Sequence, residues 1–397
     1  MVASAEEFER GVSFDLATQR KATISNVEYE LKFELQKSGP IPASVIVHFD
    51  LAKTDSPIVL DFNTPRKNVK SVLFQPRIAY SAGTTKHEIQ NGHIIIPVNE
   101  FEPGKYTVSI DFTAGDQSLN RNENFLYTLL VPDRASTVFP CFDQPDMKAK
   151  FSLTLDLPKD WTASANGAIA SKKPLEDGRE LLSFKQTKPI STYLFAFAAG
   201  EFQSITREID GQSVTMLHRE SDKEKVDRNV DDIFKIHALA LDWMQNYTKI
   251  DYPFAKFDFV LIPSFQYGGM EHIGNIFYNA DQLFLEESAT KDQKLNRASL
   301  IAHETAHMWF GNLVTMKWFD DVWLKEVFAN FMAAKIVHPR FPDINHDLGF
   351  MLKHHPSAYG EDRSGGTYPI QQKLDNLRNA GTLYGRIIYQ KAPIVMR

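Results

Sequence analysis

The chain has 397 residues, a length that favours two or three domains over a single core. Its composition, 43% hydrophobic and 24% charged, is that of a globular protein, and a net charge of −6 with both signs interspersed argues against nucleic acid as a partner. The only cysteine, Cys141, excludes an intrachain disulfide and is expected to be a small buried hydrophobe. No apolar run is long enough to span a membrane, and no secretion signal is visible at the N-terminus, so the compartment stays open.

Residues 1–205 have the pattern of an antiparallel β domain. In NVEYELKFELQ, apolar side chains from Val27 to Leu35 alternate with charged ones, as expected for a half-buried strand. SVIVHFDL, YTVSIDF and FSLTLDL repeat this alternation and are separated by turn residues. Apart from a turn near the N-terminus, no helix is predicted in this part of the chain.

Residues 206–397 change period and are predicted to form a mainly helical domain with short strands at FDFVLIP and NIFYN. SDKEKVDRNVDDIFKIHALALDWMQNY has apolar residues at helical spacing, and Ser221 is its expected N-cap. Another helix is predicted over residues 294–310, ending at Gly311. A third is predicted to begin at Asp320 or Asp321 and to end before His338.

The stretch LIAHETAHMWFGN contains the pattern H-E-x-x-H. His303 and His307 are about one helical turn apart, so both imidazoles project from one face of a helix and can bind a single metal ion. Glu304 then lies beside the ion, where it can act as general base for the attacking water. A catalytic zinc also needs a third protein ligand and keeps one position open.

Glu326 is the candidate for the third ligand. It falls close to the apolar side of the helix predicted in KWFDDVWLKEVFANFMAAKIVHP, where an unpaired carboxylate would be unfavourable. The alternative is a surface charge beside Lys325, and spacing alone does not decide between the two. Asp320 and Asp321 are candidates for orienting a ligand imidazole.

The segment HETAHMWFGNLVTMKWFDDVWLKEVFA resembles the zinc aminopeptidases of the aminopeptidase N family. In that family eighteen residues separate H-E-x-x-H from a ligand Glu, and His307 and Glu326 have this spacing. The resemblance implies an N-terminal β domain followed by a thermolysin-like catalytic domain. It also implies one zinc ion on His303, His307 and Glu326, with Glu304 as general base. The implied reaction removes residues from peptides that have a free N-terminus.

Two upstream segments extend the resemblance. YGGMEHIGN is similar to the family's G-x-M-E-N segment, whose Glu binds the substrate's amino terminus. The alternative interpretation of Glu271 is an ordinary carboxylate at the edge of a strand. The residues expected to bind substrate are Gly268, Gly269, Met270 and Glu271, and His272 replaces the family Asn. PDRASTVFPCFDQPDMKAKF resembles the segment around F-P-C-x-D-E-P. Many members have a second amine-binding Glu just before it, and Val131 stands at that position here, so the pair of carboxylates is expected to be incomplete.

The final segment, IIYQKAPIVMR, resembles the family's Y-x-K-G, whose Tyr hydrogen-bonds the oxyanion. Tyr389 takes this position and Ala392 replaces the glycine. Tyr384 is the other candidate for the tyrosine that hydrogen-bonds the oxyanion.

The resemblance stops just past this segment, so we expect an N-terminal fragment whose partners include the missing C-terminal domains. Two alternatives to a peptidase stay open. One is a zinc epoxide hydrolase of the related branch, and the other is a peptide- or metal-binding fragment without turnover.

Overall fold

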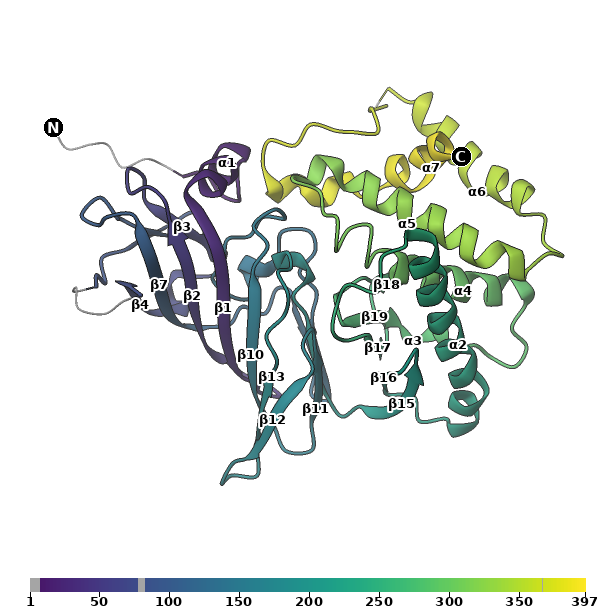
Figure 1. Cartoon of the computed structure of the whole chain (residues 1–397), viewed down its shortest axis with the longest axis horizontal. Coiled ribbons are helices and arrows are strands. Elements are labelled where there is room, and N and C mark those ends of the chain that lie inside the picture. Colours follow the sequence, from purple (N-terminus) through teal and green to yellow (C-terminus); the bar gives the residue numbers. More distant parts are fainter. Residues whose placement is uncertain (1–7, 78–82, 366) are drawn as a thin grey trace. The chain divides into compact units, whose positions relative to one another are not determined.

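The structure is a computed structural model that describes residues 8–77, 83–365 and 367–397 (Figure 1). The chain divides into two compact units. Unit 1 comprises the residues up to 163 together with 167–200 and 374–380, and unit 2 comprises 164–166, 201–373 and 381–397. No helix in the described part of the chain has the length and apolar character needed to cross a membrane.

Unit 1 is built around a seven-stranded sheet with the strand order β12-β13-β10-β1-β2-β7-β4. All neighbours in this sheet are antiparallel except β1 and β10, which run parallel with Tyr29 opposite Phe151. The prediction of an antiparallel domain is therefore right for every strand pair of this sheet but one. The strands are β1 Ile24–Glu34, β2 Pro42–Leu51, β4 Val69–Pro76, β7 Gly104–Thr113, β10 Lys150–Leu157, β12 Ile169–Pro174 and β13 Glu180–Phe184.

Two smaller sheets complete the β structure of this part of the chain. One has the order β11-β14-β9-β8 and the other β3-β6-β5. Their strands are β3 Ile58–Asp61, β5 Glu88–Gln90, β6 His93–Ile96, β8 Leu119–Arg121, β9 Phe125–Thr128, β11 Thr162–Ala165 and β14 Phe197–Gly200.

The alternation predicted from the sequence is present in the sheet. Along β1 the side chains of Val27, Tyr29, Leu31 and Phe33 are buried, whereas Glu30 and Lys32 are exposed. The Tyr29 ring stacks on Phe151 of β10 with the centroids 4.8 Å apart. Cys141 is buried and free of a disulfide, as predicted.

A helix that the sequence did not predict, α1 Phe14–Thr23, precedes β1. The Ser13 hydroxyl caps it by accepting a hydrogen bond from the backbone N–H of Leu16. Only Leu16, Ala17 and Arg20 are buried, and Arg20 is buried because its guanidinium binds Asp61. Apolar periodicity does not detect a helix that is anchored by a buried arginine.

Unit 2 contains a five-stranded sheet with the order β15-β16-β17-β19-β18, in which β16, β17 and β19 are parallel and the outer strands antiparallel. Its strands are β15 Gln203–Ile209, β16 Gln212–His218, β17 Asp258–Ile262, β18 Gly269–Met270 and β19 Asn275–Asn279. The helices of this unit are α2 Lys223–Thr248, α3 Ala280–Leu283, α4 Lys291–Ala306, α5 Val322–Val337, α6 His346–Asp362 and α7 Ala392–Met396. A π-helical turn, Ile387–Lys391, directly precedes α7.

The sheet and the helices α2, α4 and α5 share one apolar core, which includes Met216, Ile233, Phe259, Ile301 and Ala329. The helices differ from the prediction at three ends. The N-cap of α2 is Asp222 instead of Ser221, and α4 runs from Lys291 to Ala306 instead of from Lys294 to Phe310. The bounds predicted for α5 are confirmed.

Candidate metal centre

The helices α4 and α5 hold the residues of the H-E-x-x-H pattern and the candidate third ligand. A capping box fixes the start of α4: Thr290 Oγ1 accepts a hydrogen bond from Gln293 N at 3.2 Å, and Gln293 Oε1 accepts one from Thr290 N at 2.8 Å. Ala298, Ala302 and Ala306 are buried on one side of this helix. His307 is the C-cap residue and keeps helical φ and ψ angles, so it still lies one turn beyond His303.

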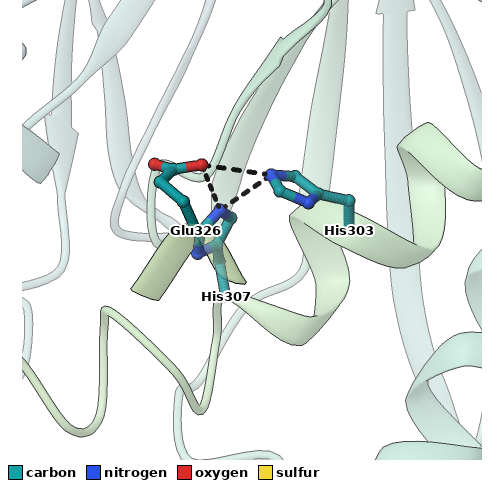
Figure 2. Close-up of side chains that lie close together, drawn as sticks. All are labelled: His303, His307 and Glu326. Atoms are coloured by element: carbon teal, nitrogen blue, oxygen red, sulfur yellow. Dashed lines mark hydrogen bonds and ion pairs between the residues drawn. The ribbon is translucent and has the colours of Figure 1, made fainter. Parts of the chain in front are cut away.

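Three ligand atoms converge between these helices, as Figure 2 shows. His303 Nε2 and His307 Nε2 are 3.0 Å apart, and Glu326 Oε2 lies 3.6 Å from the first and 3.8 Å from the second. A tetrahedral zinc ion with bonds of about 2.0–2.1 Å holds its ligand atoms about 3.3 Å apart. Two imidazoles and one carboxylate at these separations therefore fit zinc and leave a fourth position for another ligand.

The orientation of His307 supports this donor set. Its Nδ1 lies 2.9 Å from the carbonyl oxygen of Phe310, an acceptor, so Nδ1 carries the proton and Nε2 presents a lone pair to the centre. A backbone carbonyl thus orients this imidazole, and the expectation that Asp320 or Asp321 does so is wrong for His307. Asp321 Oδ1 instead accepts a hydrogen bond from Gln371.

Glu326 is buried, with 4% of the residue exposed, so the alternative of a surface charge is wrong. Lys325 beside it is also buried, at 6%, and its Nζ lies 3.3 Å from Glu326 Oε1. Burial alone would raise the pKa of Glu326, but Lys325 and the hydrogen bond with His303 outweigh it and hold that pKa well below its ordinary value. Glu326 is therefore a carboxylate, the form that a metal requires.

Glu304 lies beside the centre and is 4% exposed. Burial raises its pKa to about 8, and the nearby carboxylates Glu271 and Glu326 add to the rise. Gly269 of β18 packs directly on this side chain, because a Cβ on Gly269 would lie 2.6 Å from Glu304 Cδ and 2.7 Å from Cγ. The strand can approach Glu304 this closely only with glycine at that position.

The segment after β18 brings Glu271 to the same centre. Ligand atoms of Glu271, Glu304 and His307 lie within 4.8 Å of one another. The side-chain amide of Asn312 donates to the Glu271 carbonyl oxygen at 2.8 Å and fixes the loop, a contact that the sequence did not indicate. His272 is fully buried beside Phe277, and burial lowers its pKa to about 3, so it is a neutral packing residue.

Tyr389 lies in the π-helical turn before α7. Burial raises the pKa of its hydroxyl strongly, and Glu326 and Tyr384 add to the rise, so the phenol keeps its proton near these groups. The ring of its rival, Tyr384, lies 6.5 Å away between centroids. Val131 belongs to unit 1, where its side chain is buried and supplies no charge.

Comparison with known proteins finds two family models that together match most of the chain. The Peptidase M1 N-terminal domain matches residues 25–194, and the Peptidase family M1 domain matches residues 233–397. The first lies mainly in the β-rich unit, and the second contains the three converging ligands and Tyr389. The chain therefore belongs to peptidase family M1, with the β domain followed by the mainly helical catalytic domain that the sequence predicted.

The curated relatives are aminopeptidases. A puromycin-sensitive aminopeptidase of Caenorhabditis elegans is 35% identical over 70% of this chain and 29% of its own length. An aminopeptidase N of Streptomyces lividans is 30% identical over 96% of this chain and 45% of its own length. A leucyl aminopeptidase of Saccharolobus solfataricus is 34% identical over 66% of this chain and 33% of its own length. The chain thus spans less than half the length of each of these relatives.

Proposed function

We propose that this chain carries the active centre of a zinc-dependent aminopeptidase, which removes residues from the free N-terminus of peptides. The observation that carries the proposal is the convergence of His303 Nε2, His307 Nε2 and Glu326 Oε2 beside the buried carboxylate of Glu304. Zinc on these three ligands would supply a Lewis acid that polarises the scissile carbonyl and lowers the pKa of water.

Glu304 is assigned the role of general base. It takes a proton from the attacking water and passes that proton to the leaving amine. The carboxylate form is the active one. Burial and the carboxylates Glu271 and Glu326 raise the pKa of Glu304, so a cation bound beside it would favour the carboxylate form. The proton then has a buried acceptor that holds it until the peptide C–N bond breaks.

The remaining residues position the peptide. The strand β18 is the last in the order of its sheet, so its outer edge can pair with an extended substrate backbone at Gly268, Gly269 and Met270. Glu271 is assigned to the substrate's ammonium group, which determines the bond that lies over the centre. The Tyr389 hydroxyl, which keeps its proton, is assigned to donate a hydrogen bond to the oxyanion.

The test separates binding of zinc from chemistry. Glu304→Gln removes the proton acceptor but leaves the ligands intact, so the purified protein should retain about one zinc while kcat for a leucyl anilide falls about 10²–10⁴-fold. His307→Ala should lose stoichiometric zinc. Zinc is measured by elemental analysis, and Glu287→Gln at an exposed position serves as the matched control.

Two results would contradict the proposal. Full zinc occupancy in His307→Ala would remove that histidine from the ligand set, and near-normal turnover in Glu304→Gln would assign the base to another group. Hydrolysis of a fatty epoxide in preference to peptide amides would support the epoxide hydrolase alternative instead.

A further inference from the structure

Lys325 places a positive charge inside the proposed peptide site. It directly precedes Glu326 in α5, and its side chain is 5% exposed. Its Nζ forms an ion pair with Glu271 Oε1 and lies 3.3 Å from Glu326 Oε1. The ammonium thus contacts both the carboxylate assigned to the substrate amine and the carboxylate assigned to the metal.

The path of the lysine side chain is fixed by close packing. A Cβ on Gly311 would lie 3.3 Å from Lys325 Cδ and 3.5 Å from Lys325 Cβ, so the methylene chain runs against the Gly311 backbone. Gly311 has a φ of +127°, a conformation that favours glycine. The backbone here leaves room for the stem that carries the ammonium to Glu271.

A lysine side chain and a peptide's amino terminus are both primary ammonium groups, and both seek the same carboxylate. His272, the neighbour of Glu271, offers no competing charge because it is neutral and packs on Phe277. Within the part of the chain that the structure describes, Lys325 is the cationic side chain that pairs with Glu271. A substrate amine must therefore share or displace this partner.

We propose that Lys325 is a specificity-determining residue that weakens recognition of the substrate's free amine by serving as a built-in counter-ion for Glu271. The inference rests on the proposed aminopeptidase function and on the role assigned there to Glu271. It predicts that the natural site prefers free over acetylated N-termini less strongly than the same site would without the lysine charge. Removal of the lysine charge leaves Glu271 buried without a partner, so an incoming ammonium gains the whole interaction.

The experiment measures binding and turnover in the zinc-loaded protein. Lys325→Met keeps an unbranched side chain only one atom shorter and removes its charge. Leucinamide should bind about 10- to 100-fold more tightly to this variant by calorimetry, while N-acetyl-leucinamide should bind as before. The ratio of kcat/KM for leucyl p-nitroanilide to that for its N-acetylated form should rise by a similar factor. Lys335→Met, at an exposed position on the same helix, is the control.

Two further variants keep the outcome decisive. Lys325→Gln is uncharged but can still donate a hydrogen bond to Glu271, so it gives the answer if Lys325→Met does not fold or does not hold zinc. Adding Glu271→Gln to Lys325→Met should abolish the gain, because the gain acts through that carboxylate.

Unchanged affinity for leucinamide in a folded, zinc-loaded variant would overturn the inference, as would an equal gain for the acetylated ligand. Failure of the proposed function has a different result, because neither the natural protein nor any variant would then hydrolyse the anilide. The calorimetric comparison still decides the role of Lys325 in that case.

Discussion

Asp61 is the centre of a buried charge network in unit 1. Its carboxylate accepts two hydrogen bonds from Arg20, at 2.6 and 2.8 Å, one from the backbone N–H of Asp143 at 2.8 Å, and lies 2.9 Å from His93 Nδ1. Burial would raise the pKa of Asp61, but Arg20 and His93 outweigh it and hold the pKa far below its ordinary range. The network joins α1, β3 and β6, and it explains why unit 1 contains a helix with so few apolar residues.

Asp143 is a second buried carboxyl group near Asp61, and it accepts hydrogen bonds from the backbone N–H of Ser136 and the hydroxyl of Thr192. Burial raises its pKa to about 6, and the negative charge of Asp61 adds to the rise. A group whose pKa is higher in the folded state contributes stability below its unfolded pKa, and this contribution is lost as the pH rises through the folded value. The window for Asp143 is therefore about pH 4 to pH 6.

We expect Asp143→Asn to abolish this pH dependence. The free energy of unfolding of the natural protein should fall relative to that of the variant by up to about 3 kcal/mol between about pH 4 and pH 7. Denaturant unfolding of both proteins at several pH values measures the difference. Asp55→Asn, at an exposed position, should show no such trend. If the difference in the free energy of unfolding between the natural protein and Asp143→Asn stays constant with pH, Asp143 is already ionised at the lower pH.

At the level of single residues, the sequence indicated the side chains that can bind a metal ion. The H-E-x-x-H spacing placed His303 and His307 on one face of a helix, and the structure brings them together with Glu326. It did not indicate the contact of the Asn312 side chain with the Glu271 carbonyl oxygen, or the burial of Lys325. Contacts between segments far apart in the chain decide both cases, and no local pattern encodes them.

The two-residue strand β18 packs directly against α4 and so limits the position of the Glu304 side chain. An added Cβ at Gly269 would overlap the Glu304 side chain. Gly269→Ala should therefore displace the proposed base but leave the three metal ligands in place. We expect unchanged zinc content and a fall in kcat of about 10²-fold, the usual effect of a displacement of about 1 Å.

Gly349→Ala is the matched control for this prediction. Gly349 lies in α6 and has open space where a Cβ would be added, so the substitution should leave kcat unchanged. Equal losses of zinc and turnover in Gly269→Ala would instead mean that the strand supports the metal ligands themselves.

The elements that the sequence predicted well are those with a strong apolar period. The strand β10 alternates over its whole length, and β1, β2 and β7 alternate from Val27, Val45 and Val108 onward. The helix α5 has both ends in the predicted places. The end of α4 was placed too late, because after Ala306 the chain tightens into turns that keep apolar residues buried without continuing the helix. Apolar periodicity in the sequence indicates which side chains are buried. It does not distinguish a helix from a series of tight turns that bury the same side chains.

At the scale of the whole molecule, each unit includes a short segment distant in sequence from the rest. Residues 164–166 belong to unit 2, and Lys256 binds their carbonyl and hydroxyl groups at Ala165 and Ser164. Residues 374–380 belong to unit 1, where the backbone N–H of Leu377 donates to Val12 O. The division predicted between residues 205 and 206 follows the change of apolar period along the chain. The local pattern within one strand does not indicate that residues 164–166 or 374–380 belong to the other unit.

All three proposed metal ligands come from unit 2, two from the α4 region and one from α5. A metal ion that binds only the folded state stabilises it by about 4 kcal/mol when its free concentration is about a thousand times its dissociation constant. Removing zinc with a chelator should therefore lower the hydrogen-exchange protection of α4 and α5 amides, while amides of β1 and β10 in unit 1 keep theirs. Mass spectrometry of exchanged peptides measures both regions in one sample, and readdition of zinc should restore the lost protection. The same treatment of His307→Ala provides the control, since a protein without the site should not respond. Equal loss of protection in β1 and β10 would contradict the prediction, because it would mean that the metal stabilises both units as one cooperative body.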